Sequence, residues 1–285
     1  MIATLGSEPQ VITATLDLLL VRGIKITSLT VLHTASSEIH LKSALQQVSE
    51  EITRDTYPNL TSCKFHLLMD ETGSPLQDVD TIQAAHSFFR AIYQSVWSSK
   101  QSGCQVHLSI SGGRKTMAMY GMATAQLLFD EDDYLWHLFS GGDFLSSKRF
   151  HPVAGDETYL VAVPILLWND VSPAVKELSK TSDPFEALEK VRQLRLQEKM
   201  ETARIFVDVH LSSAERKVVR ELVLEGMSDK EIAGMLYLSP RTVEQHLRSA
   251  YRKAAEHWQM NTVTRSQLIA LLQLYFSMQN TGNPA

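Results

Sequence analysis

The chain has 285 residues, of which 44% are hydrophobic and 21% charged, and its formal net charge is −5. This composition is ordinary for a soluble globular protein. No apolar run approaches the ~18 residues that a membrane-spanning helix needs, and no signal peptide is recognisable. These features exclude a membrane or secreted protein. They predict a cytoplasmic one with two domains.

The distribution of charge and the cysteine content indicate which kinds of domain and site to expect. Residues 209–285 carry 9 Lys and Arg against 7 Asp and Glu, whereas the remainder carries 18 against 25. A less acidic C-terminal part is compatible with a small DNA-binding module. Cys63 and Cys104 fall in apolar strand patterns, which predicts buried core thiols rather than a disulfide. No cluster of His, Asp or Cys has metal-site spacing, so we expect no metal and no cofactor.

Residues 2–5 form the first predicted strand. Gly6-Ser7-Glu8-Pro9 follows, and then an apolar-periodic helix that runs to about Val21. Ser7 is placed to cap this helix, and Pro9 suits its first turn. The unit therefore ends in a free helix N-terminus, although simple capping explains Ser7 by itself.

Strands and helices then alternate. We expect further strands at 24–32, 62–69, 105–108, 134–139 and 158–163, and helices at 38–55, 78–97 and 117–129. This order predicts an α/β, Rossmann-like, doubly wound parallel sheet whose ligand crevice lies at the carboxyl ends of the strands. Strand-end residues are weaker candidates for ligand contacts: Thr34, Asp70, Ser140 and Gly141. The helix at 78–97 should turn Ile82, Ala85, Phe89, Ile92 and Val96 inward.

The segment Ser109-Ile110-Ser111-Gly112-Gly113-Arg114-Lys115-Thr116-Met117 is a strand end, a two-glycine turn and a helix start. Glycines let a backbone approach a ligand closely, and the N–H groups of a first helical turn attract anions. Arg114 and Lys115 add two positive charges there. The alternative is a tight turn with solvated basic residues.

The amino-acid sequence of this motif resembles that of the CRISPR-associated Rossmann-fold (CARF) domains, especially their ring-nuclease branch. The resemblance covers about residues 1–170 and includes His137-Leu138 and Phe150-His151-Pro152. It implies a homodimer that binds a cyclic oligoadenylate, in the first instance cyclic tetra-adenylate, as a messenger of type III CRISPR immunity. It also implies that the first and fourth strand ends lie side by side and share the ligand. The ligand-binding residues it implies are Gly6, Ser7, Glu8, Thr34, Asp70, Ser111, Gly112, Gly113, Arg114, Lys115 and Thr116.

Residues 171–208 are predicted to be a connector, punctuated by Val171-Ser172-Pro173 and Ser182-Asp183-Pro184. Asp183, Pro184 and Glu186 mark the start of a charged helix that runs to about Thr202. It either passes motion between the domains or is a solvated spacer. Residues 205–209 look extended and predict an added strand.

Residues 209–285 predict a small all-α domain. Capping boxes at Ser212/Glu215 and Ser228/Glu231, Gly226 between them, and Ser239-Pro240 mark two helices joined as a helix-turn-helix. A fourth helix starts at Thr264. The order Leu-Ser-x-x-Glu, Glu-Gly-x-Ser-x-Lys-Glu-Ile-Ala and Leu-Ser-x-x-Thr-Val-x-x-His resembles the LuxR/NarL family of DNA-binding domains. Its expected core is Val218, Val219, Leu222, Ile232, Ala233, Leu236, Val243 and Leu247.

That resemblance implies that the second helix of the motif lies in the major groove of double-stranded DNA. Glu244, Gln245 and Arg248 would face base edges. Phosphate contacts would come from Lys230, Arg241, Thr242 and Lys253. Glu244 stands where the family often has Lys or Arg, and Lys253-Ala254-Ala255 replaces the usual Lys-Leu-Gly. The alternative is a helical bundle that only dimerises. The fourth helix offers an apolar face for a dimer through Leu268, Leu271, Leu272 and Tyr275.

Three functions remain open on the sequence. The first is a transcriptional regulator that senses the ligand and binds DNA. The second is a ring nuclease that cleaves the ligand without a metal, by attack of a ribose 2′-hydroxyl on the adjacent phosphate. Lys115, Arg114, Ser111 and Ser7 would then be the catalytic residues. The third is a structural assembly protein with a vestigial pocket.

Overall fold

A computed structural model describes residues 1–35, 39–53, 56–141, 143–167 and 181–281. The chain divides into two compact units, Met1–Val191 and Arg192–Ala285. The division falls inside the expected connector at 171–208. Val171-Ser172-Pro173, and with it the expected domain boundary at 170/171, lies outside the described residues.

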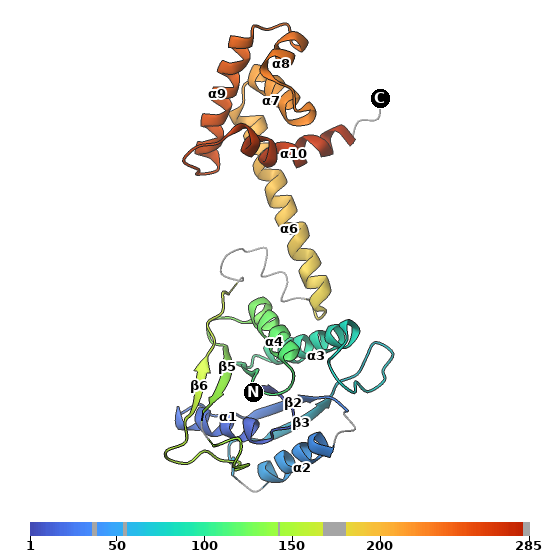
Figure 1. The fold of residues 1–285 in the computed structure, drawn as a ribbon, viewed down its shortest axis with the longest axis vertical. Helices are drawn as coiled ribbons and strands as arrows, with labels where there is room; N and C mark the ends of the chain where they lie inside the picture. Colours follow the sequence, from blue (N-terminus) through green and yellow to red (C-terminus); the bar gives the residue numbers. More distant parts are fainter. Residues whose placement is uncertain (36–38, 54–55, 142, 168–180, 282–285) are drawn as a thin grey trace. The chain divides into compact units, whose positions relative to one another are not determined.

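The first unit is built on a six-stranded sheet in the order β3-β2-β1-β4-β5-β6 (Figure 1). The strands are β1 (Ile2–Thr4), β2 (Ser28–His33), β3 (Ser62–Leu67), β4 (His107–Ser109), β5 (Tyr134–Ser140) and β6 (Thr158–Ala162). The first five are parallel, and β6 pairs antiparallel with β5. The predicted α/β sheet is confirmed, with one antiparallel edge strand added.

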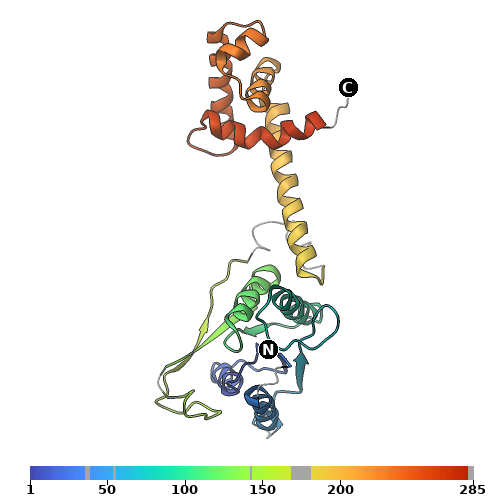
Figure 2. The ribbon, with the colours of Figure 1, turned by 45° about the vertical axis from the view of Figure 1, so that its right-hand side comes forward.

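Two helices cover each face of the sheet (Figures 1 and 2). Helices α1 (Gln10–Val21) and α2 (Ile39–Thr53) pack on one face, and α3 (Ile82–Gln101) and α4 (Lys115–Leu128) on the other. Alternate strand residues feed the two cores, since Ile2 and Leu108 join the α3–α4 side while Ala3 and Leu138 join the α1 side. The expected alternation of a doubly wound fold is thus observed.

Several expected boundaries and environments are corrected. Helix α3 begins at Ile82 rather than 78, because Thr81 caps it by accepting a hydrogen bond from the Ala84 amide at 3.1 Å. Ile82 is therefore in the first turn and is 72% exposed rather than inward. Strand β2 begins at Ser28 rather than 24.

The expected environment of the cysteines was also wrong. Cys63 is half-buried and Cys104 exposed, although both are free thiols as predicted. Cys104 precedes β4 in a turn that Gly103 opens with φ = +71°. The apolar strand pattern therefore starts later than Cys104.

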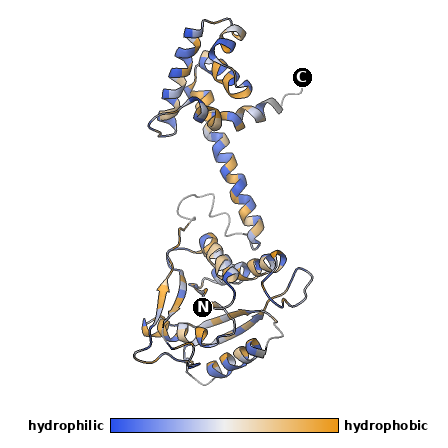
Figure 3. Ribbon diagram, viewed as in Figure 1, coloured by the Kyte–Doolittle hydropathy of each residue, from blue (hydrophilic) through white to orange (hydrophobic). Residues whose placement is uncertain are grey.

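The connector helix α6 (Pro184–Ile205) starts where the sequence predicted. The Asp183 carboxylate accepts hydrogen bonds from the amides of Phe185 (2.8 Å) and Glu186 (3.3 Å). Its surface is largely hydrophilic (Figure 3).

The strand expected at 205–209 is wrong. After Ile205 the helix continues as a π-helical turn, η2 (Phe206–His210), closed by a bond from the Leu211 amide to the Phe206 carbonyl. The β-branched and aromatic residues there favour a strand locally. Burial of Phe206 and Val207 in the core of the second unit outweighs that preference.

The second unit is helical, with α7 (Ser213–Glu225), α8 (Asp229–Met235), α9 (Pro240–His257) and α10 (Arg265–Thr281). Both predicted capping boxes are present, Gly226 ends α7 in the left-handed region, and Ser239 caps α9. All the expected core residues are buried except Leu236, which is half-buried.

The dimerisation face expected on α10 is corrected. Leu268, Leu272 and Tyr275 are buried inside the unit's own core, and Leu271 is half-buried. The apolar periodicity of α10 therefore serves this core. The residues it turns outward include Leu274.

Candidate ligand cleft and DNA-binding helix

The carboxyl ends of β1 and β4 meet at one edge of the sheet, and glycines allow this contact. The Thr4 hydroxyl donates to the Gly112 carbonyl at 2.5 Å. A Cβ atom on Gly112 would lie 2.0 Å from the Thr4 carbonyl oxygen, and one on Gly6 would lie 2.9 Å from the Gly113 nitrogen. Gly113 adopts φ = +81°. We expected these glycines to let a ligand approach the backbone, and the structure shows that they let two turns approach each other.

A cleft of about 460 Å³ opens between these turns. Eight of the predicted ligand residues line it: Gly6, Ser7, Glu8, Thr34, Ser111, Gly112, Gly113 and Arg114. Ser7 was also expected to cap α1, and this is wrong, because Pro9 holds the cap position and no side chain caps the helix. Ser7 is exposed and lines the cleft instead.

Three predicted ligand residues do not line the cleft. Lys115 is the first residue of α4, is exposed, and makes no hydrogen bond or ion pair with any described residue. Thr116 follows it and is half-buried. Asp70 lies in the turn after β3, where its carboxylate accepts hydrogen bonds from the Thr72 and Ser74 amides. Of the weaker candidates, Ser140 and Gly141 lie at the end of β5, outside the cleft lining.

The Arg114 guanidinium is paired with Asp78. Its Nε donates to Asp78 Oδ1 at 3.0 Å, and its Nη2 contacts Oδ2. The hydrogen bond from Arg114 is the main reason why the pKa of Asp78 lies below its usual range. A ligand phosphate would therefore compete with the Asp78 carboxylate for this cation.

Ser111 and Glu8 also have partners within the protein. The Ser111 hydroxyl oxygen accepts from the Leu138 amide, which leaves its own hydrogen free to donate. Glu8 receives the Lys148 ammonium, whose Nζ lies 2.7 Å from both carboxylate oxygens. The described lining of the cleft thus combines backbone turns and hydroxyl groups with one cation, Arg114, and two carboxylates, Glu8 and Asp78. The amide, hydroxyl and guanidinium donors suit a phosphodiester ligand that displaces a carboxylate.

Sequence reasoning missed several parts of this site. Gln77 and Asp78 line the cleft from the loop after β3, and Leu145 lines it from the β5–β6 loop. Of these, Asp78 was expected to begin a helix. The one usable signal was position, since both loops follow the carboxyl end of a strand.

In the second unit, helix α9 buries one face in the core and turns the other to solvent. Glu244, Gln245 and Arg248, the expected base-contacting residues, are all exposed on it. The Arg248 Nη2 donates to Glu244 Oε1 at 2.8 Å. Lys230 and Arg241 are exposed, as phosphate contacts require, while the Thr242 hydroxyl lies 2.7 Å from that of Ser239 at the helix cap.

Lys253 differs from the other expected phosphate contacts. Its Nζ lies 2.7 Å from Glu215 Oε2, and the Glu215 side chain is only 7% exposed. Burial alone would raise the pKa of Glu215, but hydrogen bonds from Lys253, Ser249 and Ser212 outweigh it and lower the pKa to about 2. Lys253 is therefore tied to the interior of its own domain.

Comparison with known proteins identifies both parts of the chain. Residues 8–196, more than half of the chain, match the family model described as CRISPR-associated protein NE0113. The chain belongs to this family. Residues 209–271 match the model described as bacterial regulatory proteins, luxR family. The chain therefore joins an NE0113-family CRISPR-associated domain, which contains the cleft, to a LuxR-type helix-turn-helix domain.

Relatives of the second domain include HTH-type transcriptional regulators of Mycobacterium bovis and Mycobacterium tuberculosis. Each is 56% identical over 43 residues, which is 15% of this chain and 5% of the relative. The chain thus spans about a twentieth of the length of these curated relatives. Their likeness covers 43 residues and, by their names, agrees with the LuxR-type domain.

Within the described residues, no group of three or more His, Cys, Asp or Glu could hold a metal ion. No helix there is both long and apolar enough to cross a membrane.

Replacing Asp78 with asparagine should tighten anion binding in the NE0113-family cleft by up to about 5-fold, because an exposed ion pair that competes for Arg114 is worth about 1 kcal/mol or less. Calorimetric titration with cyclic tetra-adenylate measures this change in affinity. Asp80→Asn is the matched control, since Asp80 is exposed two residues away and does not line the cleft. Equal affinities of the two variants would show that Asp78 does not restrain Arg114.

Proposed function

We propose that the protein is a transcriptional regulator of a type III CRISPR defence system, controlled by a cyclic oligoadenylate. The observation that supports this is the presence, in one chain, of a CRISPR-associated domain with a cleft lined by the Gly112-Gly113 turn and Arg114, and of a LuxR-type DNA-binding domain. The first domain would sense the ligand and the second would bind double-stranded DNA in the cytoplasm.

Cyclic tetra-adenylate is the ligand we propose first. A cleft of about 460 Å³ is in the range of sites for drug-sized molecules. A ring of four nucleotides is larger than such a molecule. We therefore propose a two-fold homodimer in which two clefts share one symmetric ring. A two-fold protein also suits a helix-turn-helix, since the operators of such dimers mirror their symmetry.

Ring cleavage is the second candidate function, and the position of Lys115 favours it. Its ammonium is exposed at the start of α4, next to the glycine turn, and pairs with no described residue. Lys115 and the Ser111 hydroxyl could stabilise charge on a phosphate while a neighbouring 2′-hydroxyl attacks it in line. Arg114 and Ser7, which line the cleft, would orient the ring. The helix-turn-helix would then provide feedback or targeting.

The variant Lys115→Ala tests both the proposed ligand binding and the proposed ring cleavage. We expect it to lower the affinity for cyclic tetra-adenylate by at least ~10-fold, about 1.4 kcal/mol, since it removes one charge-assisted contact. Any ring cleavage should be abolished, while ligand-free DNA binding stays intact. Titration with cyclic tri-, tetra- and hexa-adenylate, chromatography of the products and a gel-shift assay on the protein's own promoter region measure the three properties.

The control for that experiment is Lys25→Ala, which removes an exposed lysine just before β2, at the amino ends of the strands. A wild-type protein that binds none of the three rings would contradict the proposed ligand. Unchanged affinity and turnover in Lys115→Ala would show that the Gly-Gly-Arg-Lys turn is a solvated corner.

A further inference from the structure

The β5–β6 loop, residues 143–157, lies against α1 and reaches the cleft. Leu145 lines the cleft, and its carbonyl accepts a hydrogen bond from Gln10 Nε2 at 3.0 Å. From this placement we propose that the loop forms a second wall of the ligand site and that Lys148 is a further ligand-binding residue, exchanging Glu8 for a phosphate of the ligand. This inference rests on the proposed binding of a cyclic oligoadenylate.

The backbone of Lys148 supports a functional position. Lys148 has φ = +56°, in the left-handed region that side chains other than glycine rarely adopt. Such strain persists only where the surroundings enforce it, and it is concentrated at ligand sites. The Lys148 ammonium lies 2.7 Å from both oxygens of Glu8, a residue that lines the cleft.

The energetics favour an exchange of partners. The Lys148 side chain is 65% exposed, so solvent screens its ion pair with Glu8 and the pair is weak. A phosphate offers several charged acceptor oxygens and forms stronger, charge-assisted hydrogen bonds. Arg114 shows the same arrangement across the cleft, where Asp78 neutralises it. Each wall therefore holds one cation that a carboxylate neutralises until an anion arrives.

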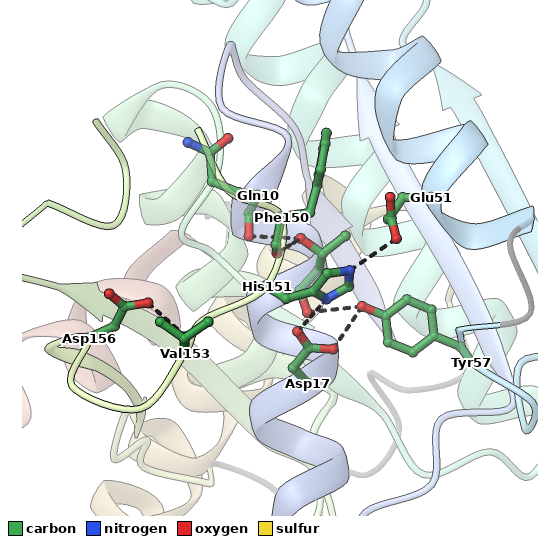
Figure 4. Close-up of polar contacts among 9 residues, drawn as sticks. Gln10, Asp17, Glu51, Tyr57, Phe150, His151, Val153 and Asp156 are labelled. Atoms are coloured by element: carbon green, nitrogen blue, oxygen red, sulfur yellow. Dashed lines mark hydrogen bonds and ion pairs between the residues drawn. The ribbon is translucent and has the colours of Figure 1, made fainter. Parts of the chain in front are cut away.

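The loop is anchored firmly enough to place Lys148. Two residues beyond Lys148, the Phe150 carbonyl accepts from the Thr13 hydroxyl on α1. Next to it His151 lies between two carboxylates, with Nδ1 2.8 Å from Asp17 Oδ2 on α1 and Nε2 3.0 Å from Glu51 Oε1 on α2 (Figure 4). Tyr57 completes the cluster by donating to Asp17 Oδ1 at 2.9 Å.

His151 can donate to both carboxylates only as an imidazolium. Burial alone would lower the pKa of His151, but the hydrogen bonds to Glu51 and Asp17 outweigh it and raise the pKa above its usual range. A raised histidine pKa stabilises the anchored loop at pH values below it, and that stabilisation is lost as the pH rises through it. His151 is therefore a positioning residue for Lys148.

The test compares Lys148→Gly with Lys25→Ala. Glycine accepts a positive φ, so this variant is compatible with the loop conformation while it removes the side chain and its cation. The probes are cyclic tetra-adenylate and inorganic pyrophosphate, titrated by calorimetry. We expect at least ~10-fold weaker binding of each probe in Lys148→Gly and no change in Lys25→Ala. Lys148→Arg, which keeps the charge, should bind much more like the wild type.

The outcomes separate this inference from the proposed function. If cyclic tetra-adenylate binds equally to Lys148→Gly and Lys25→Ala, the role of Lys148 is overturned while the proposed ligand stands. If only pyrophosphate binds, and Lys148→Gly weakens it, the second wall is supported and the proposed ligand is not. If the wild type binds neither probe, both proposals fall.

His151→Ala adds a readout that a purely structural role would not change. Wild-type affinity should fall as the pH rises through the raised pKa of His151, and this dependence should disappear in the variant. A pH profile that is the same in both proteins would remove His151 from the site.

Discussion

Gly112→Ala should destabilise the Met1–Val191 unit by about 3 kcal/mol, since the added methyl group overpacks a contact between two backbone segments. Its Cβ would lie 2.0 Å from the Thr4 carbonyl oxygen and 2.9 Å from the Thr4 carbonyl carbon. Neither atom belongs to a flexible side chain, so the ends of β1 and β4 must separate. The Thr4 hydroxyl would then lose its bond to the Gly112 carbonyl. The two turns that frame the cleft would move with them.

Chemical denaturation followed by circular dichroism measures this effect, and Gly234→Ala is its control. Gly234 lies in α8 with no atom within 4 Å of an added Cβ. There the same methyl group should be neutral or stabilising by up to about 1 kcal/mol, because alanine favours a helix over glycine. If Gly112→Ala unfolds at the wild-type denaturant concentration, the tight contact between the turns is wrong.

The sequence predicted best those features that depend on neighbouring residues. The caps at Ser212, Ser228 and Ser239 were placed correctly because each signal spans only a few residues. The parallel, doubly wound sheet was predicted from the alternation of strands and helices. The neighbouring ends of β1 and β4 were implied by the resemblance to CARF domains. The strand expected at 205–209 failed because its local β preference was opposed by burial of Phe206, which no local pattern encodes.

The same reasoning explains what was missed at the cleft. The Gly112-Gly113 turn was recognisable because glycines, a strand and a helix adjoin it. The two ion pairs at the cleft could not be predicted in this way, since Arg114 and Asp78 are 36 residues apart and Glu8 and Lys148 are 140 residues apart. The dimerisation face predicted from the periodicity of α10 was wrong for another reason. An apolar stripe shows that a face is buried, and it does not show whether the chain's own core or a partner buries it.

Lys253→Ala should lower the free energy of unfolding of the LuxR-type domain by about 1–3 kcal/mol, because it leaves the Glu215 carboxylate buried without its main counter-ion. The range is below that of fully buried pairs, since the Lys253 side chain is 27% exposed. The pH dependence of the stability of this domain should also change in Lys253→Ala. The pKa of Glu215 is lowered to about 2, so the wild-type pair stabilises the domain above about pH 4.5 and loses this effect as the pH falls towards 2. The variant should lose less stability over that interval.

Arg248→Ala provides the contrast that decides between a structural and a DNA-binding role. Its ion pair with Glu244 spans one exposed helical turn, and such pairs contribute about 0.3–0.5 kcal/mol. Arg248→Ala should therefore unfold almost like the wild type, yet lose about 1–3 kcal/mol of DNA affinity at one operator position. Lys253→Ala should show the reverse, with lower stability and nearly unchanged affinity of the folded protein. Equal stability of Lys253→Ala and wild type, with weaker binding to every DNA sequence and a smaller salt dependence, would instead make Lys253 a phosphate contact.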